Sequence, residues 1–220
     1  MKFSADAWRR NSALYNAIQT MPFNRELASG ALSQERFRRY IIQDAHYLGV
    51  YGRCLAIAAG KASTPDQLVQ LAGSAQRTVM VERSLHEGFL KTYGVTPAEF
   101  AAAEMSPSCH AYTSFLLASA HHEPFPIAVA ALLPCAWIYE EVGREIQARA
   151  APANPYQAWI DAYTSDDFRK GVKAAIALVD QAATEQTEAT VEAMHSAFTT
   201  SARFEWMFWD SAYRLEQWPA

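Results

Sequence analysis

The chain has 220 residues, enough to bury a substantial core as one large domain or two small ones. Half of the residues are hydrophobic and 12% are aromatic, which excludes a largely disordered chain. The net charge of −4 at pH 7 gives no basic surface for a nucleic acid, so we expect no nucleic-acid partner.

The sequence signals that would direct the chain to a membrane or out of the cell are weak. The N-terminus, MKFSADAWRRNS, has no apolar core after its first charge and does not resemble a signal peptide. The longest apolar run, 127–139, is shorter than the roughly 20 residues that span a bilayer. The 3 cysteines show no CxxC spacing. We therefore expect a reduced, cytoplasmic protein without a membrane partner.

Almost every segment is typical of a helix, and no sustained alternation or hairpin signal predicts a strand. In chain order, the pattern predicts helices over 4–20, 33–60, 65–92, 107–121, 125–149, 166–183 and 185–217, with short helical pieces at 97–103 and 155–162. Thr64 and Thr96 each precede a proline and begin a capping box, and Ser106 and Ser165 begin further helices. We expect one all-α domain over residues 1–220.

An acidic side chain interrupts the apolar face of helix 33–60. Asp44 lies four residues after Tyr40 and three before Tyr47, in a stripe with helical spacing. Burial of a carboxylate there costs several kcal/mol unless it is paired or hydrogen-bonded. Asp44 is therefore either a structural acid that ties tyrosine hydroxyls together or a functional group.

The last helix has a similar acid. Glu205 lies in the segment SARFEWMFWD and shares a helix face with Phe198, Phe208 and Trp209. A buried carboxyl among aromatic rings has a raised pKa, which suits a group that gives and takes protons near neutrality. A buried structural acid is the alternative.

The segment AALLPCAWIYEE places a proline and a thiol at the centre of an apolar helix. Pro134 removes one backbone donor, which leaves the carbonyl near Ala130 without its usual partner and loosens the helix just before Cys135. Most buried cysteines are inert small hydrophobes. A nucleophilic Cys135 requires a neighbour that lowers its pKa or accepts its proton, and no histidine lies at helical spacing from it.

Two further tyrosines are candidates for the same site. Tyr112 shares a face with Phe115 and Leu116, and Tyr163 lies just before an expected helix start. A single core tyrosine only requires a hydrogen-bond partner. Two acids, a thiol and several tyrosines on separate apolar faces together predict a small polar pocket inside a helical bundle.

Five blocks spread from about residue 5 to 218 carry a family resemblance: FRRYIIQDAHYLGVYGRCLAIAAGKA, CHAYTSFLLASA, ALLPCAWIYEEVG, YQAWIDAYTSDDF and SARFEWMFWDSAYRLEQW. In order and separation they resemble the TenA family (thiaminase II, aminopyrimidine aminohydrolase). The resemblance implies a haem-oxygenase-like all-α bundle, a homotetramer, and a hydrolase of thiamin metabolism that needs neither haem nor metal as cofactor.

The resemblance also implies the roles of the catalytic groups. Cys135 corresponds to the nucleophilic cysteine, Glu205 to the general acid/base, and Asp44 to the acid that holds the aminopyrimidine nitrogens. The implied reaction converts 4-amino-5-aminomethyl-2-methylpyrimidine, and thiamin as a second substrate, to 4-amino-5-hydroxymethyl-2-methylpyrimidine. The remaining implied substrate-binding residues are tyrosines that orient the nucleophile and the pocket and aromatic residues of its wall: Tyr47, Tyr112, Tyr139, Tyr163 and Phe208.

The sequence departs from the family pattern after the motif aspartate. The segment QDAHYL has Ala45 and His46 where an aromatic residue often follows the aspartate. Both positions point away from the Asp44–Tyr47 face. We therefore expect altered packing with the chemistry retained.

Two other functions compete with this one. A metal-dependent oxygenase of the same fold would use Glu82 and His86, which share a helix face at i, i+4. The other histidines show no clustering with acids, and no histidine on the first helix could bind a haem. A non-catalytic pyrimidine-binding or regulatory protein would keep Asp44 and the aromatic walls without needing Cys135 and Glu205 together.

Overall fold

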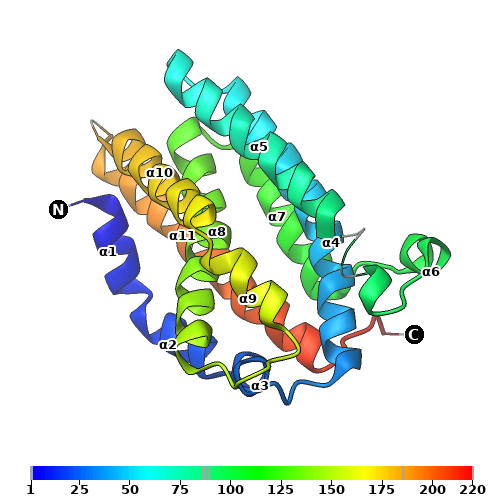
Figure 1. The fold of residues 1–220 in the computed structure, drawn as a ribbon. Helices are drawn as coiled ribbons and strands as arrows, with labels where there is room; N and C mark the ends of the chain where they lie inside the picture. Colours follow the sequence, from blue (N-terminus) through cyan, green and yellow to red (C-terminus); the bar gives the residue numbers. More distant parts are fainter. Residues whose placement is uncertain (1, 86–87, 89, 185, 220) are drawn as a thin grey trace. The chain divides into compact units, whose positions relative to one another are not determined.

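The computed structural model describes residues 2–85, 88, 90–184 and 186–219, with the side chains of residues 82–85 excepted. Within these ranges the regular elements are helices and no strand is present (Figure 1). In chain order they are α1 (Phe3–Arg10), α2 (Ser12–Thr20), α3 (Pro22–Ser29), α4 (Gln34–Gly60), α5 (Pro65–Leu85), α6 (Pro97–Ala102), α7 (Pro107–His122), α8 (Phe125–Arg149), α9 (Gln157–Thr164), α10 (Asp166–Ala183) and α11 (Glu188–Tyr213). The expected all-α class is confirmed.

The capping residues begin helices where the sequence predicts them. The Thr96 side chain and Glu99 form the full reciprocal capping box. Ser106 and Ser165 each accept a hydrogen bond from the backbone N–H three residues further on, at 3.2 and 3.3 Å. Thr64 does the same, although the Gln67 side chain turns back to Ser63, outside the expected box.

The N-terminal region differs from the single helix expected over 4–20. Asn11 separates α1 from α2, and its side-chain Nδ2 donates to the Ala7 carbonyl at 2.9 Å. A side-chain amide that competes for a backbone carbonyl in this way interrupts a helix. The short helix α3 was not expected, although Pro22 at its first position and Gly30 in the left-handed region, with φ of 74°, are typical of a helix start and end.

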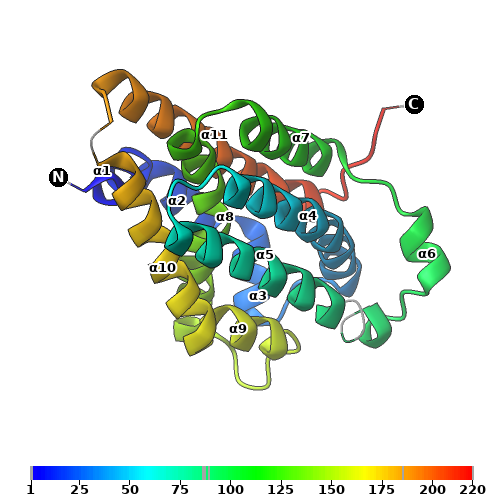
Figure 2. The ribbon, with the colours of Figure 1, turned by 90° about the horizontal axis from the view of Figure 1, so that it is seen from above.

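The chain divides into two compact units, each made of two chain segments. Unit 1 comprises Met1–Leu32 and Pro124–Trp206, and unit 2 comprises Ser33–Glu123 and Met207–Ala220. In unit 1, α8 packs against α3, α9 and α10. In unit 2, α4 lies between α5 and α7 (Figure 2). The expected extent of one domain over 1–220 stays a prediction.

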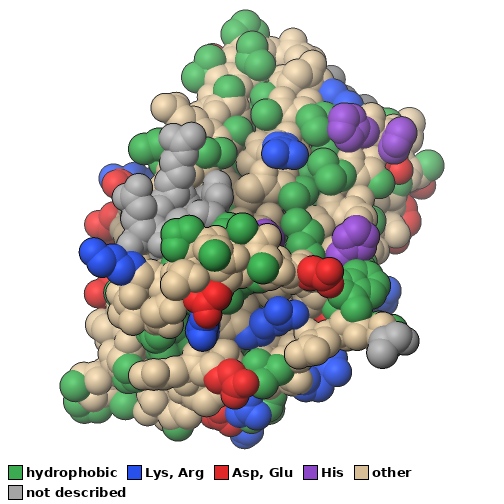
Figure 3. Space-filling view, turned by 90° about the vertical axis from the view of Figure 1, so that its right-hand side faces the viewer, with side chains coloured by type: hydrophobic (Ala, Val, Ile, Leu, Met, Phe, Trp, Pro, Cys, Tyr) green, Lys and Arg blue, Asp and Glu red, His purple; other side chains and the backbone are tan. Residues whose placement is uncertain are grey.

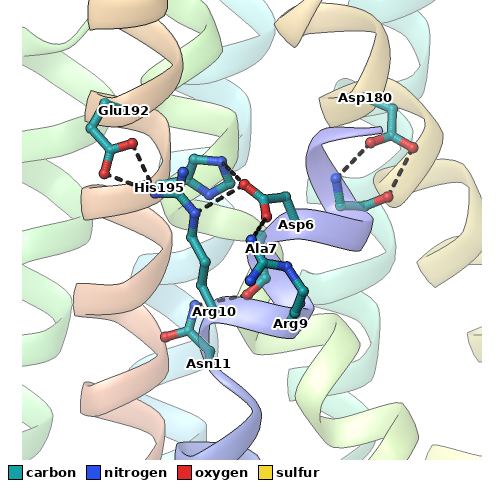
Figure 4. A network of polar contacts seen from close by, with 9 residues as sticks. Asp6, Ala7, Arg9, Arg10, Asn11, Asp180, Glu192 and His195 are labelled. Atoms are coloured by element: carbon teal, nitrogen blue, oxygen red, sulfur yellow. Dashed lines mark hydrogen bonds and ion pairs between the residues drawn. The ribbon is translucent and has the colours of Figure 1, made fainter. Parts of the chain in front are cut away.

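Polar contacts attach the N-terminal helix to the rest of unit 1 (Figure 4). The backbone N–H and hydroxyl of Ser4 donate to Asp180 of α10 at 2.8 and 2.9 Å. Arg10 donates to both carboxylate oxygens of Glu192 on α11 at 2.8 Å, and its Nε donates to Asp6 at 2.9 Å. Both Arg10–Glu192 bonds come from the same nitrogen, Nη1. Charge-assisted hydrogen bonds of Arg10 and the Ser4–Asp180 contacts therefore join α1 to α11 and α10.

The apolar helix α8 is the central helix of unit 1. Among the described residues, α8 has the length and composition that a membrane crossing requires, although 67% of its most apolar stretch is buried inside the structure. The core helix of a soluble protein meets the same criteria. The burial of α8 is what a core helix requires, and α8 also carries Cys135.

Candidate functional site

The predicted site residues are divided between the two units, and each group can be described within its own unit. Unit 2 contains Asp44 and Tyr47 on α4, Tyr112 on α7 and Phe208 on α11. Unit 1 contains Cys135 and Tyr139 on α8, Tyr163 on α9 and Glu205 on α11. Every one of them except Tyr163 is buried.

The aromatic residues of unit 2 form one cluster. The Tyr47 ring lies 4.9 Å from the Tyr112 ring and 5.6 Å from the Phe208 ring, measured between centroids. Tyr40 meets Phe208 edge to face at 6.0 Å. These distances are typical of favourable ring pairs. Residues far apart in sequence, on α4, α7 and α11, thus lie together in unit 2, and their role in a substrate site stays a prediction.

Asp44 lies one turn before Tyr47 on α4 and is 3% exposed. Its buried Oδ2 has no hydrogen-bond partner among the described residues. Burial raises the pKa of Asp44 from its usual 3.8 to about 7. This oxygen therefore does not tie a tyrosine hydroxyl, and a buried carboxyl with an unused oxygen is suited to a ligand.

The two residues that depart from the family pattern, Ala45 and His46, directly follow Asp44 on α4. The His46 ring stacks on Phe100 of α6 with centroids 4.8 Å apart. Ala45 is buried. The sequence did not identify their neighbour Gln43, whose side chain accepts from Ser106 N–H at 2.7 Å and donates to the Glu104 carbonyl at 3.0 Å. Gln43 thereby holds the start of α7, the helix that carries Tyr112.

Cys135 follows Pro134 inside the continuous helix α8. Its side chain is outside any disulfide among the described residues and is 8% exposed. Glu205 on α11 is 1% exposed. Pro134 was expected to leave the Ala130 carbonyl without its intrahelical donor. The next carbonyl, that of Ala131, accepts a hydrogen bond from Ser201 Oγ at 2.6 Å. Pro134 thus lies within one turn of the carbonyl through which α8 accepts a hydrogen bond from α11.

Tyr139 and Tyr163 lie together in unit 1. Their ring centroids are 4.9 Å apart, and Trp159 lies 4.6 Å from Tyr163. Phe168 meets Tyr163 edge to face at 5.2 Å. The sequence placed Tyr163 in the connection before a helix, whereas α9 extends to Thr164, so that Tyr163 occupies its last turn.

The close approach of α8 and α9 depends on Gly143, which lies one turn after Tyr139. A Cβ atom at Gly143 would lie 3.1 Å from the Tyr163 Cβ and 3.5 Å from the Tyr163 backbone carbon. The 3.1 Å distance is tighter than an ordinary van der Waals contact, so a side chain at 143 requires Tyr163 to shift by a few tenths of an ångström. The sequence signal was a glycine inside a helical pattern, which often has a packing reason.

Gly143→Ala is expected to lower the thermal midpoint of unfolding, because the added methyl group displaces Tyr163. Gly171→Ala is the matched control, since Gly171 lies inside α10 and has no atom within 4 Å of its Cβ position. A helical Gly→Ala change without a clash stabilises by roughly 0.5–1 kcal/mol. Opposite shifts of the two midpoints in calorimetry support the close contact, and equal shifts contradict it.

The metal-site hypothesis has little support in the part of the chain that the structure describes. There, no group of three or more His, Cys, Asp or Glu side chains is placed to bind a metal ion. The Glu82–His86 pair lies outside this part, since neither the Glu82 side chain nor His86 is described.

A helical fold with a buried acid, a buried thiol and clustered tyrosines matches a known class of proteins. Residues 9–215 match the TENA/THI-4/PQQC family, and the chain belongs to that family.

Individual relatives agree with this assignment. The chain is 33% identical over 219 residues to the aminopyrimidine aminohydrolase of Bacillus subtilis, covering 99% of this chain and 92% of the relative. The solved structure of a TenA homologue from P. horikoshii OT3 has a TM-score of 0.88 and 27% identity, covering 97% and 99% of the two chains. A haem-oxygenase-like domain from Shewanella denitrificans has a TM-score of 0.76 at 12% identity, covering 96% and 92%. The expected haem-oxygenase-like fold is confirmed.

Proposed function

We propose that the protein is an aminopyrimidine aminohydrolase, a thiaminase II of thiamin salvage. The observation that carries the proposal is 33% identity over nearly the full length of a relative with that name. The buried thiol of Cys135 and the buried carboxyls of Asp44 and Glu205 support it, because this chemistry requires a nucleophile, a proton donor and a group that recognises the ring.

Asp44 recognises the aminopyrimidine edge of the substrate. With a pKa of about 7, Asp44 is substantially protonated at neutral pH and offers one O–H donor beside one acceptor oxygen. An aminopyrimidine presents the complementary pair, a ring nitrogen that accepts and an amino group that donates. The partnerless Oδ2 of Asp44 supports this role, since a substrate would supply the missing hydrogen bond.

Cys135 and Glu205 carry out the substitution. The Cys135 thiolate adds to the unsubstituted ring carbon, and the displaced electron pair moves to the ring nitrogen. Loss of aromaticity allows the exocyclic methylene carbon to expel ammonia, with a proton from Glu205, or the thiazole when thiamin is the substrate. Water then adds to the methylene carbon, Glu205 takes up a proton, and departure of the thiolate restores the aromatic ring.

The test is turnover of 4-amino-5-aminomethyl-2-methylpyrimidine in metal-free buffer with a chelator, followed by ammonia release and chromatography, with thiamin assayed in parallel. Stoichiometric ammonia and 4-amino-5-hydroxymethyl-2-methylpyrimidine are expected. Turnover that needs both added metal and dioxygen would favour the oxygenase alternative. Binding of the pyrimidine without any turnover would favour the regulatory alternative.

The proposal includes a cytoplasmic homotetramer with small-molecule substrates and no nucleic-acid or membrane partner. The cysteines are all buried and outside any disulfide among the described residues, which supports a reducing compartment. Exposed apolar side chains on α5, namely Leu68, Val69, Met80 and Val81, support association between copies. Hydrophobic side chains also appear on the upper surface in Figure 3, near the start of α5. Light scattering on the purified protein tests the assembly, and a monomer mass contradicts it.

Asp44→Asn is expected to reduce the pH dependence of stability. Folded Asp44 keeps its proton up to about pH 7, whereas an unfolded aspartate loses it near 3.8, so wild-type stability falls as the pH rises through this window. At 1.36 kcal/mol per pH unit the loss amounts to about 4 kcal/mol over the whole window, of which about 3 kcal/mol falls above pH 5. The free energy of unfolding, measured with denaturant at pH 5 and pH 8, should fall less between the two pH values for Asp44→Asn than for the exposed control Asp66→Asn. Equal falls would mean that Asp44 is not the group concerned.

A further inference from the structure

One buried hydroxyl links the helix of the proposed nucleophile to the helix of the proposed acid/base. Ser201 of α11 is 0% exposed, and its Oγ donates to the Ala131 carbonyl of α8 at 2.6 Å. The two residues are 70 positions apart in sequence and belong to the same unit. A short, fully buried hydrogen bond of this kind fixes the relative position of the segments that it joins.

The positions of the two partners in their helices are matched. Ala131 precedes Cys135 by four residues, and Ser201 precedes Glu205 by four residues. Residues four apart on a helix share a face and lie one turn from each other. The Ser201–Ala131 bond therefore lies one turn before each proposed catalytic residue.

Pro134 makes this turn of α8 weaker than an ordinary helical turn. Proline has no N–H to donate, so the carbonyl four residues earlier, at Ala130, loses its intrahelical donor. Helices loosened in this way bend or move unless another group holds the turn. Ser201 supplies such a group from the neighbouring helix, at the carbonyl next to the one that the proline affects.

We propose that Ser201 is a positioning residue that holds the turn of Cys135 in register with the turn of Glu205. The inference rests on the proposed function, since it assigns to Ser201 the alignment of that nucleophile and that acid. Ser201 touches no reacting atom in this role. It acts through the Ala131 carbonyl, so that thiol and carboxyl reach one substrate in fixed geometry.

The role predicts a loss in the chemical step with binding retained. Ser201→Ala should lower kcat about tenfold, because small displacements of reacting groups have large kinetic effects. Binding of 4-amino-5-hydroxymethyl-2-methylpyrimidine, measured by calorimetry, should stay within about twofold, because Asp44, the group proposed to recognise the ring, lies on α4 and outside the two helices that this bond joins. Ser201→Thr keeps the hydroxyl and should recover kcat. Ser201→Cys keeps a similar volume but has only a weak S–H donor, so it should not recover kcat.

Thr200→Ala is the matched control, since the Thr200 hydroxyl bonds to the Ser196 carbonyl of its own helix at 2.9 Å. It should leave kcat and the binding constant unchanged. A Ser201→Ala protein that unfolds at lower temperature but keeps wild-type kcat would overturn the proposal. So would a variant whose kcat and binding decline together.

A second readout separates this inference from the proposed function. In the absence of substrate, iodoacetamide labelling of Cys135 is followed by peptide mass spectrometry. Loss of the Ser201 bond frees the turn that carries the thiol, which is 8% exposed, so labelling should accelerate at least about threefold in Ser201→Ala but not in Thr200→Ala. Unchanged labelling overturns the positioning role, even if the wild-type protein turns over no pyrimidine.

Discussion

Replacement of Cys135 by serine is expected to lower kcat/KM for the aminomethylpyrimidine by about a thousandfold or more. A serine hydroxyl remains protonated at neutral pH, whereas a thiol loses its proton far more readily and is a stronger nucleophile. The substitution changes one atom in a buried site, so the folded state should persist. Steady-state kinetics by chromatography, with circular dichroism to verify folding, measures the effect.

The other two cysteines provide matched controls. Cys54 and Cys109 are free and buried in unit 2, and burial raises the pKa of each thiol to about 12. Both thiols are therefore protonated at neutral pH and unreactive. Cys54→Ser and Cys109→Ser should retain turnover within a few-fold of wild type. A Cys135→Ser protein that turns over like these controls would rule out nucleophilic catalysis by Cys135.

Glu205→Gln is expected to lower kcat by about 10²- to 10⁴-fold, the usual contribution of a general acid/base. Glutamine keeps the volume and much of the hydrogen-bonding capacity of Glu205, which matters at a residue that is 1% exposed. It cannot deliver a proton to the leaving ammonia or accept one from water. Binding of 4-amino-5-hydroxymethyl-2-methylpyrimidine should therefore persist while the chemical step is lost.

The pH profile gives a second criterion for Glu205. The wild-type kcat profile should have a limb that reports the ionisation of Glu205, and this limb should be absent from the Glu205→Gln profile. Glu192→Gln, an exposed change on the same helix that weakens the pair with Arg10, should leave the profile unchanged. An intact limb in Glu205→Gln would assign the proton transfer to another group.

Features that depend on neighbours in sequence were predictable. The caps at Thr96, Ser106 and Ser165 begin helices where expected, because a cap bonds to a backbone N–H three residues away. The break at Asn11 was missed, since its side-chain amide can either cap a helix or interrupt one. Tyr163 was predicted to lie in a connection, whereas it lies in the last turn of α9, because the sequence carries no strong signal for the end of that helix.

From the sequence, the candidate site could be predicted only as a set of residues, and their roles stay predictions. Helical spacing placed Asp44 beside Tyr47, and the proline drew attention to Cys135. Spacing gave no information about what the Asp44 oxygens contact, so the alternative of a structural acid remained open. The structure shows that Asp44 Oδ2 is buried without a hydrogen-bond partner, so this oxygen does not tie a tyrosine hydroxyl.

The sequence by itself determined the helical class, the main helix starts and the resemblance to one enzyme family, because these properties follow from short-range patterns. Only the tertiary structure decided that Ser201 donates to the Ala131 carbonyl, that Tyr163 packs closely against Gly143, and that the Tyr47 and Phe208 rings are in contact. Each of these contacts joins two different helices. Their geometry follows from how side chains pack, to within tenths of an ångström, and helical periodicity does not contain that information.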